Sequence, residues 1–261
     1  KFGMPEMGIK GAAVASVMAE AASLAFFLIY TYAKVDFKKF GLNHWQKIDF
    51  SLLGKILSIS CFTMIQYFLA MATWFVFFIA IERLGQRELA IANIVRSIYI
   101  VMLIPVQALS TTTNSLVSNL IGAGKSEQVM GLCGRMVRIC YYFVLPLAIL
   151  IALFPELVLR IYTDNPDLIA SSVSSLWVML SSYLIAVPAF IFFFSVSGTG
   201  NTQTALLIDM ASIFVYVYAL WVGIRMHADV AACWTTEHVY DLMILSAFFY
   251  LWKGNWRNKK L

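Results

Sequence analysis

The chain has 261 residues, of which 61% are hydrophobic and 13% are charged, whereas about a quarter of the residues in a soluble domain are charged. A mean hydropathy of +0.80 leaves too few polar side chains to cover a surface in water, so the composition excludes a soluble protein and predicts an integral membrane protein. Basic loops beside membrane spans account for the net charge of +5, and no nucleic-acid partner is predicted.

Seven apolar stretches are long enough to cross a bilayer, which takes about twenty residues in a helix. Helices are expected because lipid offers no hydrogen-bond partner to an open backbone. We therefore predict an all-α, polytopic membrane bundle of about seven transmembrane helices. In chain order these helices cover residues 11–33, 51–81, 88–121, 131–154, 167–197, 202–225 and 230–252.

Residues 34–50 separate the first predicted helix from the other six, and this polar stretch is expected to be a boundary between two bundles. The chain opens on KFGMPEMGIK, which is typical of a connecting loop, so we expect a piece of a longer protein. By the positive-inside rule, the loops richer in Lys and Arg are predicted to face the cytoplasm. These are loops 34–50, 122–138, 198–201 and 253–261.

Polar residues follow one face of the third predicted helix, at alternating steps of three and four residues. They are Asn93, Ser97, Gln107, Thr111, Asn114 and Ser118. This face either forms hydrogen bonds with a neighbouring helix or lines an aqueous cavity. The amides of Gln107 and Asn114 favour the cavity, because polar groups within spans often mark a substrate path.

The second predicted helix repeats this pattern more weakly, with Gln66 or Tyr67 on a mixed aromatic and polar face. Such a mixture suits a pocket for flat, partly apolar molecules. When each of these residues is taken alone, ordinary helix packing is the better explanation.

Ionisable residues also lie inside the predicted spans: Glu20, Arg96, Asp209 and Asp241. Each would cost about 2.5–3.5 kcal/mol at the bilayer centre. One interpretation is that they pair, pack or reach the interface. The other is a proton or ion site, because a buried carboxyl group can exchange a proton with its surroundings.

Two patterns that suggest other functions fail on their spacing. Residues 122–126, GAGKS, match the end of a phosphate-binding loop, but the glycine required five positions before Gly124 is Asn119, and a long apolar stretch precedes the motif where a strand is required. The loop 227–238, HADVAACWTTEH, holds His, Cys, Asp and Glu without a standard ligand spacing, so no metal site or cofactor is predicted. No catalytic arrangement of side chains stands out, which argues against an enzyme.

Four stretches carry recognisable motifs in a fixed order. They are MGIKGAAVASVMAE (7–20), residues 89–127 around GAGKSE, LVLRIYTDNPDLI (157–169) and VSGTGNTQTALLID (196–209). Together they resemble the MATE family of multidrug and toxic-compound extrusion transporters, over nearly the whole chain and in the second half of a full transporter.

The resemblance implies two six-helix lobes around a central cavity, with residues 1–33 as the last transmembrane helix of the N-terminal lobe and 34–50 as a cytoplasmic interlobe linker. It implies that 51–252 form the C-terminal lobe and 253–261 a basic cytoplasmic tail. The expected protein is a multi-pass transporter of the cell inner (plasma) membrane, completed by the missing N-terminal lobe. It would exchange Na+ or H+ for hydrophobic, cationic compounds by alternating access.

Site residues transfer only in part from this family. A cation-binding Glu of the NorM-like branch corresponds to a position near Gln66, and a second acid of that branch corresponds to a position near Ala186. The coupling acid is therefore expected at Asp209, at Glu20 or in the missing lobe, as in the DinF-like branch. Expected cavity residues are Gln66, Tyr67, Asn93, Arg96, Gln107, Thr111 and Asn114.

Two other functions stay open at this point. A flippase for lipid-linked oligosaccharides shares this architecture, but it should carry several Arg in its cavity to bind pyrophosphate, and only Arg96 is expected to lie deep. A non-transporting membrane scaffold is the second alternative.

Overall fold

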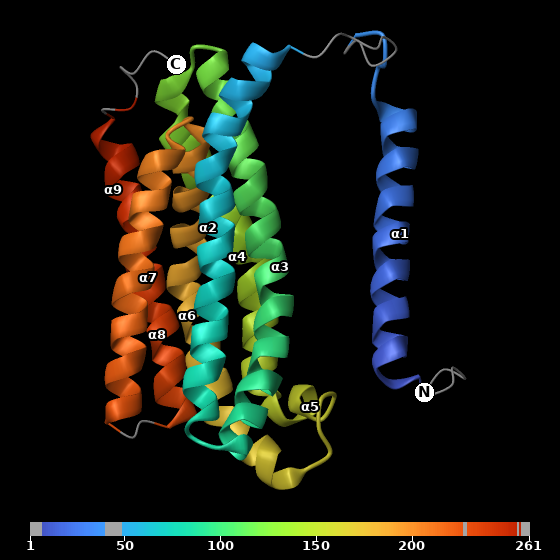
Figure 1. Cartoon of the computed structure of the whole chain (residues 1–261), viewed down its shortest axis with the longest axis vertical. Coiled ribbons are helices and arrows are strands. Elements are labelled where there is room, and N and C mark those ends of the chain that lie inside the picture. Colours follow the sequence, from blue (N-terminus) through green and yellow to red (C-terminus); the bar gives the residue numbers. More distant parts are fainter. Residues whose placement is uncertain (1–6, 40–48, 227–228, 255, 257–261) are drawn as a thin grey trace. The chain divides into compact units, whose positions relative to one another are not determined.

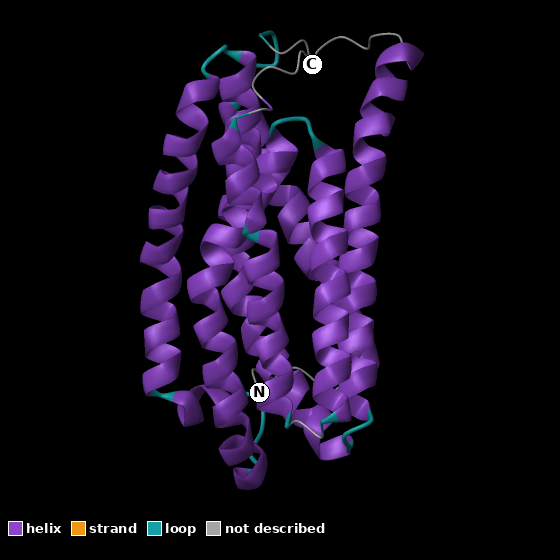
Figure 2. Cartoon of the chain, turned by 90° about the vertical axis from the view of Figure 1, so that its left-hand side faces the viewer, coloured by secondary structure: helices purple, strands orange, loops and turns teal. Residues whose placement is uncertain are grey.

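The computed structural model describes residues 7–39, 49–226, 229–254 and 256. Every regular element in these ranges is a helix, and none of them is a strand (Figure 2). The elements are α1 (Gly8–Lys34), α2 (Phe50–Glu82), α3 (Gln86–Gly122), the short 3-10 helix η1 (Ser126–Gln128), α4 (Val129–Leu153), α5 (Pro155–Leu159), α6 (Pro166–Gly198), α7 (Thr202–Arg225), α8 (Val230–Ile244) and α9 (Ser246–Lys253) (Figure 1). The predicted all-α class is confirmed.

Within the described ranges, six helices are long and apolar enough to cross a membrane. They correspond to the first six predicted spans, in α1, α2, α3, α4 with η1, α6 and α7. The seventh predicted span is divided at Leu245 into α8 and α9, each shorter than the twenty residues or so that a bilayer requires. Leu245 keeps helical backbone angles, with φ −62 and ψ −16, so the pair together covers the predicted stretch. The chain is a multi-pass membrane protein.

The chain divides into two compact units, residues Lys1–Leu53 and Gly54–Leu261. The first contains α1, whose apolar side chains are exposed along its length. The predicted interlobe segment 34–50 falls within this unit, and its residues 40–48 lie outside the described residues. The assignment of the two units to separate lobes stays a prediction.

Helix α6 is the most buried span of the bundle, with 67% of its apolar window inside the structure. Its last residue, Gly198, lies against the backbone of Asn114 on α3, so the two helices meet closely at this end. The hydroxyl of Ser118 adds a hydrogen bond of 2.8 Å to the carbonyl oxygen of Gly198. This close contact holds α3, which carries the predicted polar face, against the centre of the bundle.

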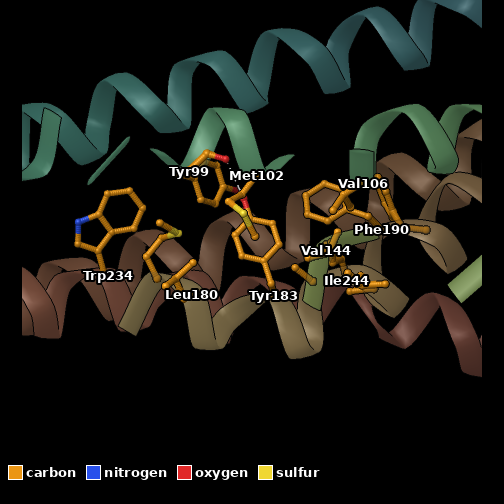
Figure 3. Packing of buried hydrophobic residues seen from close by; sticks show 14 of the residues in the cluster. Tyr99, Met102, Val106, Val144, Leu180, Tyr183, Phe190, Trp234 and Ile244 are labelled. Atoms are coloured by element: carbon orange, nitrogen blue, oxygen red, sulfur yellow. Dashed lines mark hydrogen bonds between the residues drawn. The ribbon is translucent and has the colours of Figure 1, made fainter. Parts of the chain in front are cut away.

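An aromatic cluster joins α2, α3, α6 and α8. The ring centroids of Trp74 and Tyr99 are 5.3 Å apart, those of Phe77 and Trp234 are 5.2 Å apart, and those of Tyr99 and Tyr183 are 5.8 Å apart. The Tyr183 hydroxyl donates a 2.8 Å hydrogen bond to the Tyr99 carbonyl oxygen. Figure 3 shows Tyr99 and Tyr183 close together, with Trp234 to one side of them. These contacts set the rotation of the helices that line the site.

The starts of α6, α7 and α8 are each capped by a side chain. Asn165 accepts a hydrogen bond from the amide of Asp167, Asn201 from Thr204, and Asp229 from Ala232. Capping satisfies amide groups that a helix leaves unpaired at its first turn. The caps explain why these helices begin where the apolar runs begin.

Residues 122–126, GAGKS, form the turn between α3 and η1, in which Gly124 has a φ of 73. A positive φ is strained for residues with a side chain, so glycine is favoured there. In Figure 1 this turn and the turn between α6 and α7 lie at one end of the bundle, and the α2–α3 turn lies at the other. The motif therefore connects two membrane helices.

Candidate functional site

A cavity of about 340 Å³ lies inside the bundle, between α2, α3, α6, α7 and α8. This volume is at the lower end of the range that holds small organic molecules. Its lining residues are Ile59, Thr63, Gln66, Tyr67, Ala70, Gln107, Asn114, Phe190, Phe193, Phe194, Ser197, Thr202, Asp209 and Tyr240. None of them is basic, so the cavity presents a carboxyl group, amides and aromatic rings.

Among the described residues that line this cavity, Asp209 is the one acid. Asp209 is 3% exposed, and its Oδ1 accepts a 2.9 Å hydrogen bond from the hydroxyl of Tyr240. The amide of Gln66 is also within hydrogen-bonding reach of this carboxyl group. No basic side chain is among the described residues that line the cavity. An ionised Asp209 would therefore need a bound cation to balance its charge, whereas a protonated Asp209 would be neutral.

Aromatic rings form the apolar part of the cavity lining. Phe190, Phe193 and Phe194 come from consecutive turns of α6, and Tyr67 comes from α2. Aromatic faces attract cations electrostatically and pack well against flat molecules. The combination of these rings with Asp209 suits a flat ligand that carries a positive charge.

A second, smaller cavity of about 120 Å³ lies in the same bundle, and we call it the inner cavity. It shares Ala70, Gln107, Phe190 and Tyr240 with the larger cavity, so the two adjoin. Glu237 lines the inner cavity, is 7% exposed, and accepts hydrogen bonds from the hydroxyls of Tyr99 and Tyr216, at 3.4 and 3.2 Å.

The stretch 227–238 was described as a loop, whereas the seventh predicted span begins at residue 230, and the structure agrees with the span. Helix α8 begins at Val230, after the N-cap of Asp229, and carries Glu237 into the core of the bundle. The spacing of Glu237 and Asp241 is the signal that could have revealed it. Acids four residues apart share one face of a helix, and Asp241 was already predicted to lie within a span.

Several expected cavity residues lie together in the structure. Gln66, Tyr67, Gln107, Asn114 and the coupling candidate Asp209 line the larger cavity, although they come from three different helices. Gln66 is 8% exposed, so its amide is buried in an apolar bundle where it needs a partner. Their roles in transport stay predictions.

Three other expected residues do not line either cavity. The amide of Asn93 donates a 2.9 Å hydrogen bond to the Leu89 carbonyl oxygen of its own helix, and the Arg96 guanidinium lies 5.0 Å from the centre of the Phe78 ring. Thr111 is exposed. The predicted polar face runs from 93 to 118, which is about 38 Å of helix at 1.5 Å per residue. A single cavity of this size is too short to be lined by every residue of that face.

Glu20, the other coupling candidate, lies on α1, where it is exposed. Helix α1 belongs to the first unit, and Asp209 belongs to the second. The role of Glu20 therefore stays a prediction.

Residues 230–238 of the stretch 227–238 lie in α8, and Asp229 is its N-cap. His227 lies outside the described residues, and His238 Nε2 is 2.9 Å from the Ser181 hydroxyl. Among the described residues, no three His, Cys, Asp or Glu side chains come together in a way that could hold a metal ion.

Known proteins resemble this chain in sequence. The family model MatE matches residues 60–222. The probable multidrug resistance protein NorM of Thermotoga maritima is 28% identical over 219 residues, which cover 82% of this chain and 46% of that protein. The chain thus spans about half the length of this curated relative.

Solved structures share the fold at low sequence identity. A crystal structure of MATE in complex with MaL6 has a TM-score of 0.78 at 14% identity, covering 95% of this chain and 57% of the other. An outward-facing multidrug resistance MATE family transporter of the MOP superfamily has a TM-score of 0.66 at 15% identity, covering 78% and 46%. A MOP superfamily transporter from Pyrococcus furiosus has a TM-score of 0.66 at 14% identity, covering 78% and 45%.

Proposed function

Since the chain belongs to the MatE family of multi-pass plasma-membrane transporters, we propose that it supplies the C-terminal lobe and the preceding helix of a multidrug efflux transporter. The complete protein would export hydrophobic, cationic compounds by alternating access, in exchange for Na+ or H+. The remaining lobe, which this chain lacks, would form the other side of the central passage. The protein would act as a secondary active transporter, without a catalytic centre.

The observation that carries this proposal is the larger cavity, in which a buried carboxyl group faces aromatic rings. Asp209 supplies negative charge, and Phe190, Phe193 and Phe194 supply apolar surface. The amides of Gln66 and Gln107 can orient a ligand by donating or accepting hydrogen bonds. This lining favours a cation with a flat apolar body over an anion or a sugar.

Coupling to an ion is proposed at Asp209, with Glu20 as a second candidate. Gln66 and Ala186 stand near the positions at which the resembling branch carries acids, and neither can ionise. Asp209 adjoins Gln66 and lines the cavity, so a change in its protonation or ion occupancy would act directly on a bound cation.

The geometry gives less support to a flippase for lipid-linked oligosaccharides. Such a protein must neutralise pyrophosphate, for which Arg is suited, and neither cavity has a basic residue in its lining. Arg96 was expected to lie deep, yet in this chain it is exposed and lies over the Phe78 ring. A scaffold without transport would require no cavity with a buried acid.

Alanine variants of Gln66, Gln107 and Asn114 in the full-length protein test the cavity. We expect each to reduce drug resistance and the counterflow of a fluorescent cation in liposomes, because each loses a polar group of the lining. Gln128→Ala is the matched control, since this amide is exposed at the start of α4. Wild-type resistance in all three variants at equal expression would contradict the cavity assignment, and no flux under either ion gradient would favour a scaffold.

A further inference from the structure

A groove of about 280 Å³ lies on α4 and shares no lining residue with either cavity described above. Its lining residues recur at steps of three or four, so they share one face of the helix. They are Arg138, Tyr141, Tyr142, Leu145, Pro146 and Ile149. Apart from one guanidinium and two hydroxyls, these side chains are apolar. We call this feature the α4 groove.

The α4 groove faces away from the larger cavity. The hydroxyl of Tyr141 donates a 2.6 Å hydrogen bond to the Leu184 carbonyl oxygen on α6, so the groove borders this part of α6. Leu184 is 58% exposed and lies about two and a half turns before Phe193, which lines the cavity. The two residues are therefore on opposite faces of α6. Because α4 and α6 are membrane spans, an exposed side of this kind is surrounded by lipid.

One wall of the groove is held by a hydrogen bond for which the sequence creates the need. A carbonyl oxygen in a helix normally accepts the amide four residues later. For Leu184 this position is Pro188, which has no N–H to donate. The Tyr141 hydroxyl supplies the missing donor. The packing of α4 on α6 therefore fixes the position of this ring.

A basic group stands at the end of the groove nearer the start of α4. The Nε of Arg138 lies 3.5 Å from the Gly134 carbonyl oxygen, so the side chain turns back toward η1. Arg135 is also exposed and lies three residues earlier, which makes the two arginines neighbours on the helix surface. The acid closest to them along the chain is Glu127 in η1, about two turns before Arg135. Neither arginine forms an ion pair with a described residue.

Open space lies beside these arginines. A Cβ atom built on Gly131 or on Gly134 would meet nothing within 4 Å. The helix surface is therefore low at this end, and a bulky polar group has room next to the two guanidinium groups. The apolar part of the groove continues from there toward the far end of α4.

The length and the charge of the α4 groove favour an anionic phospholipid over other occupants. From Arg138 to Ile149 the helix rises by about 16 Å, which is close to half of the roughly 30 Å hydrocarbon core and thus to one leaflet. Arginine binds phosphate oxygens through two parallel hydrogen bonds. A second protein would need about 800 Å² of surface on each partner, which is more than a groove lined by one turn-by-turn row of side chains offers.

We propose that the α4 groove binds an anionic phospholipid, with the phosphate at Arg135 and Arg138 and one acyl chain along Leu145 and Ile149. This inference does not depend on the proposed function. The lipid belongs to the leaflet at the η1 end of the bundle, which is the cytoplasmic leaflet in the predicted orientation. That leaflet is the one in which anionic lipids attract basic residues near the membrane surface.

Native mass spectrometry of the purified full-length protein tests the proposal, with phosphatidylglycerol or phosphatidylcholine of the same acyl chains added to the detergent. We expect the wild type to retain phosphatidylglycerol more strongly. Arg138→Gln should weaken this binding about fivefold, because that is the contribution of one basic residue near an anionic lipid surface. Arg135→Gln/Arg138→Gln should weaken it further, and the binding of phosphatidylcholine should change little in either variant.

Arg83→Gln is the matched control. Arg83 is exposed in the turn between α2 and α3, at the opposite end of the bundle from the start of α4 (Figure 1). The substitution removes the same charge as Arg138→Gln, and it should leave the binding of phosphatidylglycerol unchanged. An equal loss in the two variants would overturn the proposal, because the attraction would then be a general effect of net charge.

The acyl chain is tested separately from the phosphate. Tyr142→Ala removes a ring of the groove that is 77% exposed, and it should also weaken the binding of phosphatidylglycerol, because apolar contact is lost. Glycerol phosphate, which has the anionic group without the chains, should not displace the lipid. Displacement by glycerol phosphate would show a site for free phosphate, and unchanged binding in Tyr142→Ala would show that the groove is not occupied. Either result would overturn the proposal.

Discussion

Gly198→Ala tests the close approach of α3 and α6. A Cβ atom built on Gly198 would lie 2.7 Å from the Asn114 carbonyl oxygen, and 3.2 Å from both Asn114 Cα and Val117 Cβ. Two of these three atoms belong to the backbone, so they cannot turn away as a flexible side chain would. The substitution therefore forces the helices apart and strains the 2.8 Å hydrogen bond from Ser118 to the Gly198 carbonyl oxygen.

The expected loss follows from three contributions. Overpacking costs about 1–3 kcal/mol, and weakening of the hydrogen bond adds about 0.5–1.5 kcal/mol. Alanine regains about 0.5–1 kcal/mol, because it is a better helix former than glycine. The net decrease in the free energy of unfolding is about 0.5–4 kcal/mol, and each 1.4 kcal/mol is a tenfold change in the unfolding equilibrium.

Denaturation of the full-length protein in detergent, followed by tryptophan fluorescence, measures this change. Gly131→Ala is the matched control, since it lies in α4 and its added Cβ would meet nothing within 4 Å. We expect Gly131→Ala to leave the protein as stable or to stabilise it by up to about 1 kcal/mol. A Gly198→Ala protein that is as stable as the Gly131→Ala protein would refute the close contact.

Two further predictions concern the core and the topology. Tyr183→Phe should lower the free energy of unfolding by about 0.5–1.5 kcal/mol, because it deletes the buried hydrogen bond to the Tyr99 carbonyl oxygen. Tyr142→Phe, at a residue that is 77% exposed, should change it by less than about 0.5 kcal/mol, and equal effects in thermal denaturation would rule out a role for the buried bond. In a cysteine-free background, Lys125→Cys should react with a membrane-impermeant maleimide from the cytoplasmic face and Asp164→Cys from the outer face. Labelling of both from one face would contradict the predicted orientation.

The sequence by itself determined where the membrane helices lie. The predicted span 167–197 corresponds to α6 at Pro166–Gly198, and 202–225 corresponds to α7 at Thr202–Arg225. The reason is that the bilayer demands long apolar runs, and polar loops and capping residues end them. Polar residues that stand out against such runs, including Gln66, Gln107 and Asp209, could also be recognised without a structure.

Only the tertiary structure decided which of these residues meet. Phe190, Phe193 and Phe194 lie in an apolar run, where a ring that lines a cavity looks the same as one that faces lipid. Glu237 was described within a loop although it also falls in the seventh predicted span, and only the packing of α8 shows that it is buried in the core. Hydropathy records how apolar a helix is, but the contacts between helices set the rotation of each one. That rotation brought Gln66 to Asp209 and left Asn93 exposed at the surface of this chain.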